Sequence, residues 1–100
     1  NEALKRVERA ISEIKKGRMV IMMDDEDREN EGDLVYAATF STPELVNFMA
    51  KEARGLICTP VTRAIAKKLH LIPMVSNNVS NHETAFTVSI DSVTAEAGIS

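Results

Sequence analysis

Hydrophobic residues near the start of the chain recur at the spacing of an α-helix. Leu4, Val7, Ile11 and Ile14 follow one another at intervals of three or four, and charged residues fill most of the positions between them. This periodicity predicts an amphipathic helix. Gly17 follows two lysines and is typical of a helix end, because glycine accepts a left-handed backbone and cations face the negative end of the helix dipole.

The rest of the chain alternates between short apolar segments and further helical patterns. The sequence Ser41-Thr42-Pro43-Glu44 combines a hydroxyl cap, an early proline and a first-turn acid, which predicts a helix start, and Gly55 is expected to end that helix. The predicted elements after the first helix are strands at 19–23, 34–38, 56–59 and 84–91 and helices at 43–54 and 63–69, the second of which Thr62 can cap. This order predicts an α+β fold in which helices pack on a layered, mixed β-sheet.

Size and composition set the class of protein. A chain of 100 residues with 44% hydrophobic residues is predicted to be a single domain, 1–100, whose open sheet edge we expect a longer natural chain or a partner to complete. The longest apolar run, 19–23, is too short to cross a bilayer and the N-terminal pattern is not a secretory signal, so we expect a cytoplasmic protein with no membrane partner. A single cysteine excludes an internal disulfide, and a net charge of -3 without a basic stripe argues against nucleic acid as a partner.

The charge is concentrated in one stretch. Residues 24–33 carry seven of the fifteen acids and one arginine, so the remaining chain has eight acids against eleven bases. Acidic loops are commonly only solvated, but clustered carboxylates also suit hard cations such as Mg²⁺. Because both flanking segments are apolar and of strand length, the loop is held against the domain, which favours a metal or substrate site. An EF-hand is excluded, since Gly32 at loop position six would place Ala38, not a glutamate, at position twelve.

The sequence Asp-Asp-Glu-Asp-Arg-Glu-Asn-Glu-Gly-Asp at 24–33 resembles the signature of the 3,4-dihydroxy-2-butanone 4-phosphate synthases. These riboflavin-pathway enzymes convert ribulose 5-phosphate to a four-carbon phosphate and formate. Three further blocks, at 55–58, 73–78 and 84–90, resemble the family in the same order and at similar spacing. Four ordered blocks are more specific than one acidic run, and the resemblance covers nearly the whole chain and the N-terminal half of a family member.

The resemblance implies the family's fold, a carbon–carbon lyase that acts on a small sugar phosphate with Mg²⁺ or Mn²⁺, and a homodimer. It also implies site residues, namely catalytic Glu31 and Cys58, substrate-binding Arg28, Glu29, Asp33 and Thr84, and the metal ligand Glu29. In an extended segment, Glu29, Glu31 and Asp33 would point to one side. For Cys58 a role as a small core residue stays open, and Thr84 is more simply read as a strand residue.

Neighbouring residues have structural interpretations. Residues 24–27 are expected to order the loop and to support Arg28 electrostatically. His70 is expected to cap a helix or to face solvent, and His82 falls in a polar loop away from the family's ligand positions. The family's metal-binding histidine belongs to a later block, which residues 1–100 do not include.

One segment departs from the family pattern. Where the family has Val-Thr-Thr-Gly, this chain has Ala-Glu-Ala-Gly at 95–98, and the carboxylate of Glu96 would repel a phosphate. The alternative to the lyase is a non-catalytic cation-binding or assembly module that keeps the fold but lacks half of the site. A third interpretation is a bifunctional parent fused to a GTP cyclohydrolase II-like domain.

Overall fold

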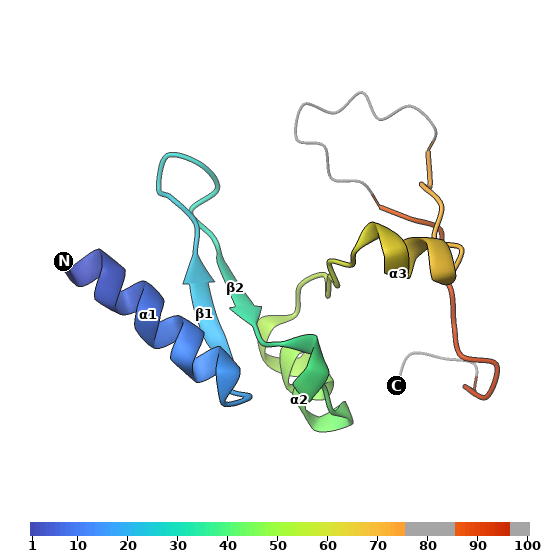
Figure 1. The fold of residues 1–100 in the computed structure, drawn as a ribbon, viewed down its shortest axis with the longest axis horizontal. Helices are drawn as coiled ribbons and strands as arrows, with labels where there is room; N and C mark the ends of the chain where they lie inside the picture. Colours follow the sequence, from blue (N-terminus) through green and yellow to red (C-terminus); the bar gives the residue numbers. More distant parts are fainter. Residues whose placement is uncertain (76–85, 97–100) are drawn as a thin grey trace. The chain divides into compact units, whose positions relative to one another are not determined.

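The computed structural model describes residues 1–75 and 86–96 (Figure 1). The chain divides into two compact units, Asn1–Thr59 and Pro60–Ser100. In the described ranges, no helix is both long enough and apolar enough to cross a membrane.

The first unit begins with helix α1 (Glu2–Lys15). Asn1 caps it by accepting a hydrogen bond at Oδ1 from the Ala3 amide at 2.9 Å. Gly17 follows the helix with a left-handed φ of 82°, and Arg18 pairs with Glu13 at 2.9 Å, which ties the turn back to the helix. The helix and its glycine end are therefore confirmed.

An antiparallel hairpin follows α1. Strands β1 (Val20–Met23) and β2 (Gly32–Val35) pair with Val20 opposite Val35 and Met23 opposite Gly32, and α1 packs next to β1. Both strands were predicted, but the second begins two residues earlier and ends three residues earlier than the apolar run 34–38 indicated. The acidic residues 24–31 therefore form the loop at the tip of the hairpin (Figure 1).

The chain then forms a short 3₁₀ turn, η1 (Ala38–Phe40), helix α2 (Pro43–Phe48) and a π-helical turn, η2 (Met49–Ala53). The predicted hydroxyl cap of α2 is provided by Thr42, whose Oγ1 accepts a hydrogen bond from the Leu45 amide at 3.2 Å. The helical segment ends at Arg54, with a left-handed φ of 60°, and not at Gly55. The wide turn closes through a hydrogen bond from the Arg54 amide to the Met49 carbonyl at 3.3 Å. The helical segment therefore ends one residue earlier than the predicted Gly55.

The strand predicted at 56–59 is not present. These residues are irregular, and the side chain of Leu56 is largely exposed. A strand is stable only when its backbone groups pair with a neighbour, and no described segment pairs with 56–59. The apolar run indicated burial and did not by itself specify a strand.

The second unit contains helix α3 (Arg63–Lys68), which Thr62 caps as predicted by accepting from the Ile65 amide at 3.2 Å. Beyond it, Pro73 and Thr87 form an isolated antiparallel bridge. Of the strand predicted at 84–91, residues 84 and 85 lie outside the described residues, and 86–91 contribute only this bridge.

The structure confirms the α+β class, with helices and a small antiparallel sheet. Among the described residues no side chain is fully buried, and the apolar faces of the elements are open, with Ile21 69% and Leu4 57% exposed. The described residues thus place the hairpin, its loop and the segment after η2, without enclosing a hydrophobic core of their own.

Candidate functional site

The acidic loop is organised by its first residue, Asp24. The Asp24 amide donates to the Glu31 carbonyl at 2.9 Å, which extends the hairpin ladder by one bond. Its carboxylate accepts hydrogen bonds from the Asp25 amide at 2.7 Å, the Glu29 amide at 2.9 Å and Nη1 of Arg28 at 3.1 Å. Asp24 therefore orders the loop and supports Arg28, as predicted for this residue.

The Asp24 carboxylate is held in its ionised form. Partial burial raises its pKa, but the hydrogen bonds from the amides of Glu29 and Asp25 and from the Arg28 guanidinium outweigh that effect. The pKa of Asp24 consequently lies below its ordinary value of 3.8. At neutral pH this residue acts as a hydrogen-bond acceptor with a full negative charge.

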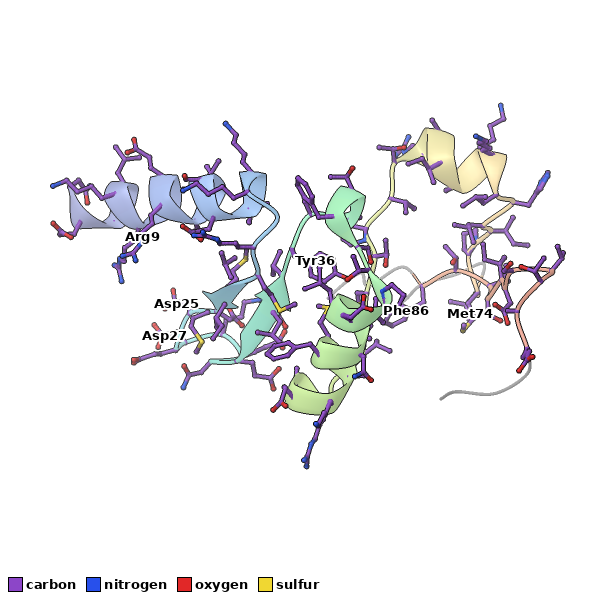
Figure 2. The ribbon with its side chains drawn as sticks, turned by 90° about the horizontal axis from the view of Figure 1, so that it is seen from below. Arg9, Asp25, Asp27, Tyr36, Met74 and Phe86 are labelled. Carbon is purple, nitrogen blue, oxygen red and sulfur yellow. The ribbon has the colours of Figure 1, made fainter. Side chains whose placement is uncertain are left out.

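Arg28 connects two acids of the loop. Its Nη1 contacts Asp24, and its Nη2 lies 3.2 Å from Oε1 of Glu29. The side chains of Arg28 and Glu29 are 66% and 56% exposed, so both can also reach a ligand. Asp25 and Asp27 project from the same loop (Figure 2). The loop thus presents one positively charged side chain, that of Arg28, among several carboxylates.

A left-handed residue separates Glu29 from the strand that follows. Asn30 has a φ of 52°, and its amide donates to the Asp25 carbonyl at 3.1 Å. The extended backbone begins only after this residue, so the predicted alignment of Glu29, Glu31 and Asp33 on one side is wrong for Glu29. Asparagine accepts this conformation more readily than most residues, which allows the loop to turn before β2 starts.

Glu31 and Asp33 line an open groove of about 560 Å³. It is also lined by Gly32 and Leu34 of β2, by Met49 and Ala53 of η2, and by the irregular segment that ends at Cys58. Cys58 is a free, exposed cysteine. The structure therefore brings together three of the predicted site residues from two parts of the chain, and it places Arg28 and Glu29 in the adjoining loop.

Thr84, predicted to bind substrate, and His82 lie outside the described residues. His70 follows α3 in a left-handed conformation, φ 56°, and is exposed, in agreement with its predicted surface or capping position.

A divalent cation would need more ligands than the described residues offer. Within 1–75 and 86–96 there is no group of three or more His, Cys, Asp or Glu side chains that could hold a metal ion. Glu29, the predicted ligand, already contacts Arg28 through Oε1. It could supply one carboxylate, but these residues do not form a metal site by themselves, and no chemical step can be assigned to a metal from this geometry.

Sequence reasoning missed the groove residues Met49 and Ala53. They lie four positions apart in the helix predicted at 43–54, and this spacing of one helical face indicates only burial. The signal that could have pointed to these two groove residues is their spacing directly before the block at 55–58. The π-helical turn that carries both residues could not be inferred from that spacing.

The model of the 3,4-dihydroxy-2-butanone 4-phosphate synthase family matches residues 8–100. A protein of that name from Wolinella succinogenes is 66% identical over 97 residues, which cover 97% of this chain and 28% of that protein. One from Helicobacter hepaticus is 64% identical over 96% of this chain and 27% of its own length. The riboflavin biosynthesis protein RibBA of Bacillus cereus is 54% identical over 95% of this chain.

A solved structure gives the same result. The crystal structure of RibBX, a two-domain 3,4-dihydroxy-2-butanone 4-phosphate synthase from A. baumannii, aligns with a TM-score of 0.67 at 53% identity, over 75% of this chain and 22% of that one. The hairpin, its acidic loop and the adjoining groove thus occur in a chain similar to enzymes of riboflavin biosynthesis. The chain belongs to the 3,4-dihydroxy-2-butanone 4-phosphate synthase family. It spans about a quarter of the length of the curated relatives it matches.

Proposed function

We propose that the full-length protein converts D-ribulose 5-phosphate to 3,4-dihydroxy-2-butanone 4-phosphate and formate, as a carbon–carbon lyase of riboflavin biosynthesis. Family membership and the names of the relatives support this function. The observation that carries it is the groove shared by Glu31, Asp33 and Cys58, directly after the loop that bears Arg28 and Glu29.

The chemistry requires a group that removes a proton next to a carbonyl and groups that hold the sugar. A carboxylate within reach of the carbon acid performs the first task, and we assign it to Glu31. Asp33 lies two residues further along, lines the same groove, and accepts hydrogen bonds from substrate hydroxyls. Cys58 completes the groove from another segment and contacts the substrate there.

Arg28 supplies the positive charge that an anionic substrate needs. In a loop of carboxylates a phosphate would be repelled, but the guanidinium offers several donors in one plane and two of its nitrogens are already oriented by Asp24 and Glu29. Because two-thirds of the side chain is exposed, donors remain available for a hydroxyl or a phosphate oxygen. Arg28 and Glu29 therefore bind the substrate together.

For the cofactor we propose Mg²⁺ or Mn²⁺, bound through Glu29 and through ligands outside the described residues. Such an ion supplies positive charge at the substrate oxygens when it is bound. The homodimer and the cytoplasmic location also stay predictions. Light scattering on the purified protein tests the first, and cell fractionation tests the second.

Formate release from D-ribulose 5-phosphate, measured with the full-length protein in Mg²⁺ and in EDTA, tests the proposal. We expect steady release that EDTA abolishes and that added Mg²⁺ or Mn²⁺ restores. A folded protein that releases no formate under any of these conditions would contradict the lyase and favour the non-catalytic cation-binding or assembly module. Activity that is unchanged in EDTA would contradict the metal dependence alone.

A further inference from the structure

Asp24 differs from the other leading acids of the loop in its surroundings. Its side chain is only 16% exposed, whereas residues 25–27 are exposed. The backbone of Asp24 is fixed to the hairpin through its bond to the Glu31 carbonyl. A carboxylate that is anchored to a regular element and largely covered can serve as a fixed reference point for more mobile neighbours.

A single oxygen of Asp24 reaches both substrate-binding residues. Oδ2 accepts from the backbone amide of Glu29 at 2.9 Å and from Nη1 of Arg28 at 3.1 Å. Oδ1 accepts from the Asp25 amide at 2.7 Å and so fixes the rotation of the carboxylate. The backbone of one residue and the side chain of the other are thus located by the same atom.

We propose that Asp24 is a positioning residue of this site, which sets the geometry between the Arg28 guanidinium and Glu29 without contacting the substrate itself. This inference rests on the proposed function, in which Arg28 and Glu29 bind the substrate. A displacement of about 1 Å in the groups that position a substrate can cost about a hundredfold in rate, so loss of the shared acceptor should lower kcat/KM strongly.

The substitution Asp24→Asn in the full-length protein removes the charge and places either an amide nitrogen or a weaker acceptor opposite Arg28. We expect kcat/KM for D-ribulose 5-phosphate to fall by about a hundredfold, chiefly through KM, while the melting temperature stays above the assay temperature. The matched control is Asp27→Asn in the same loop, whose carboxylate makes no hydrogen bond or ion pair among the described residues. It should change kcat/KM by no more than about twofold.

A double-mutant cycle with Arg28→Ala separates positioning from general stabilisation. If Asp24 acts through Arg28, then Asp24→Asn should lower kcat/KM by about tenfold or less in the Arg28→Ala background. The loss is smaller there because the guanidinium that Asp24 positions has already been removed. Equal losses in both backgrounds would overturn the proposal. If Asp24→Asn unfolds at the assay temperature, the same cycle is run with Asp24→Glu, which keeps the charge but displaces it by one methylene.

Amide hydrogen exchange of Glu29 provides a readout that does not depend on turnover. We expect slow exchange in the wild type and fast exchange in Asp24→Asn, with no change in Asp27→Asn. Fast exchange in the wild type would contradict the bond on which the proposal rests. If the wild type releases no formate, the proposed function fails together with this role. If the wild type is active and the losses of Asp24→Asn and Arg28→Ala are additive, the role of Asp24 is refuted and the proposed function is not.

Discussion

A side chain at Gly17 would begin 3.2 Å from the ring of Phe40, so the end of α1 and the 3₁₀ turn η1 approach each other at a position where a Cβ atom barely fits. Gly17 also has a left-handed φ of 82°. Gly17→Ala should therefore destabilise the full-length protein by about 1–2 kcal/mol from the backbone conformation alone. Thermal unfolding followed by circular dichroism measures the change.

Gly55→Ala is the matched control for that substitution. A Cβ atom at Gly55 meets nothing within 4 Å, and its φ lies outside the left-handed region. We expect a melting temperature close to that of the wild type. Equal destabilisation by the two alanines would contradict the conformational argument for Gly17.

Asn30 tests the turn between the acidic loop and β2. With φ at 52°, Asn30→Gly should leave stability nearly unchanged, whereas Asn30→Ala should cost about 1 kcal/mol because alanine is unfavourable in that conformation. Urea denaturation of the three proteins compares them directly. Equal destabilisation by glycine and by alanine would show that the asparagine side chain, and not its backbone conformation, carries the effect.

Local signals explain what the sequence predicted well. The period of α1 and its glycine end, the threonine caps of α2 and α3 and the two strands of the hairpin all follow from residues within one element or its immediate neighbours. The segment 56–59 failed because a strand depends on a partner, and apolar character alone says nothing about pairing. Arg54 took the left-handed position expected of Gly55 because the π-helical turn changed the length of the preceding helix, a feature without a sequence pattern here.

The site shows the same division between local and non-local information. Alternation alone does not explain why Glu31, directly before β2, and Asp33, within β2, both reach the groove, because Gly32 and Leu34 line it as well. Alternation failed for Glu29, where the left-handed Asn30 interrupts the alternation. That Cys58 shares a groove with Glu31 could not follow from periodicity, since the approach depends on η2 and the irregular segment behind it.

The lowered pKa of Asp24 predicts a pH dependence of stability. A carboxyl group that is more acidic in the folded state than its ordinary 3.8 stabilises the fold when it is ionised. This contribution is fully present at pH values well above 3.8 and is lost as the pH falls through the lower folded-state pKa. The difference in unfolding free energy between the wild type and Asp24→Asn should therefore be constant near neutrality and shrink as the pH falls below 3.8.

Denaturant unfolding of both proteins across this range measures the difference, with Asp27→Asn as the control. The control should show the same dependence on pH as the wild type, because no comparable set of donors surrounds Asp27 among the described residues. A gap between wild type and Asp24→Asn that widens toward acid would have the wrong sign for a depressed pKa.

Glu31→Gln and Asp33→Asn separate the two carboxylates of the groove. Loss of a general base typically costs about a hundredfold to ten-thousandfold in kcat, so Glu31→Gln should act mainly on kcat, and Asp33→Asn should also raise KM. Both residues are exposed, which predicts melting temperatures near that of the wild type. Glu26→Gln, in the loop but away from the groove, is the control and should keep near-normal kinetics.

Substitutions at Cys58 distinguish contact with the substrate from a packing role. The thiol is free and exposed at the end of the groove segment, so Cys58→Ser should lower kcat/KM by about tenfold or more without a large change in melting temperature. Cys58→Ala, which removes the polar atom entirely, should lower it at least as much. A normal rate in both variants together with a lower melting temperature would assign the cysteine to packing and remove it from the site.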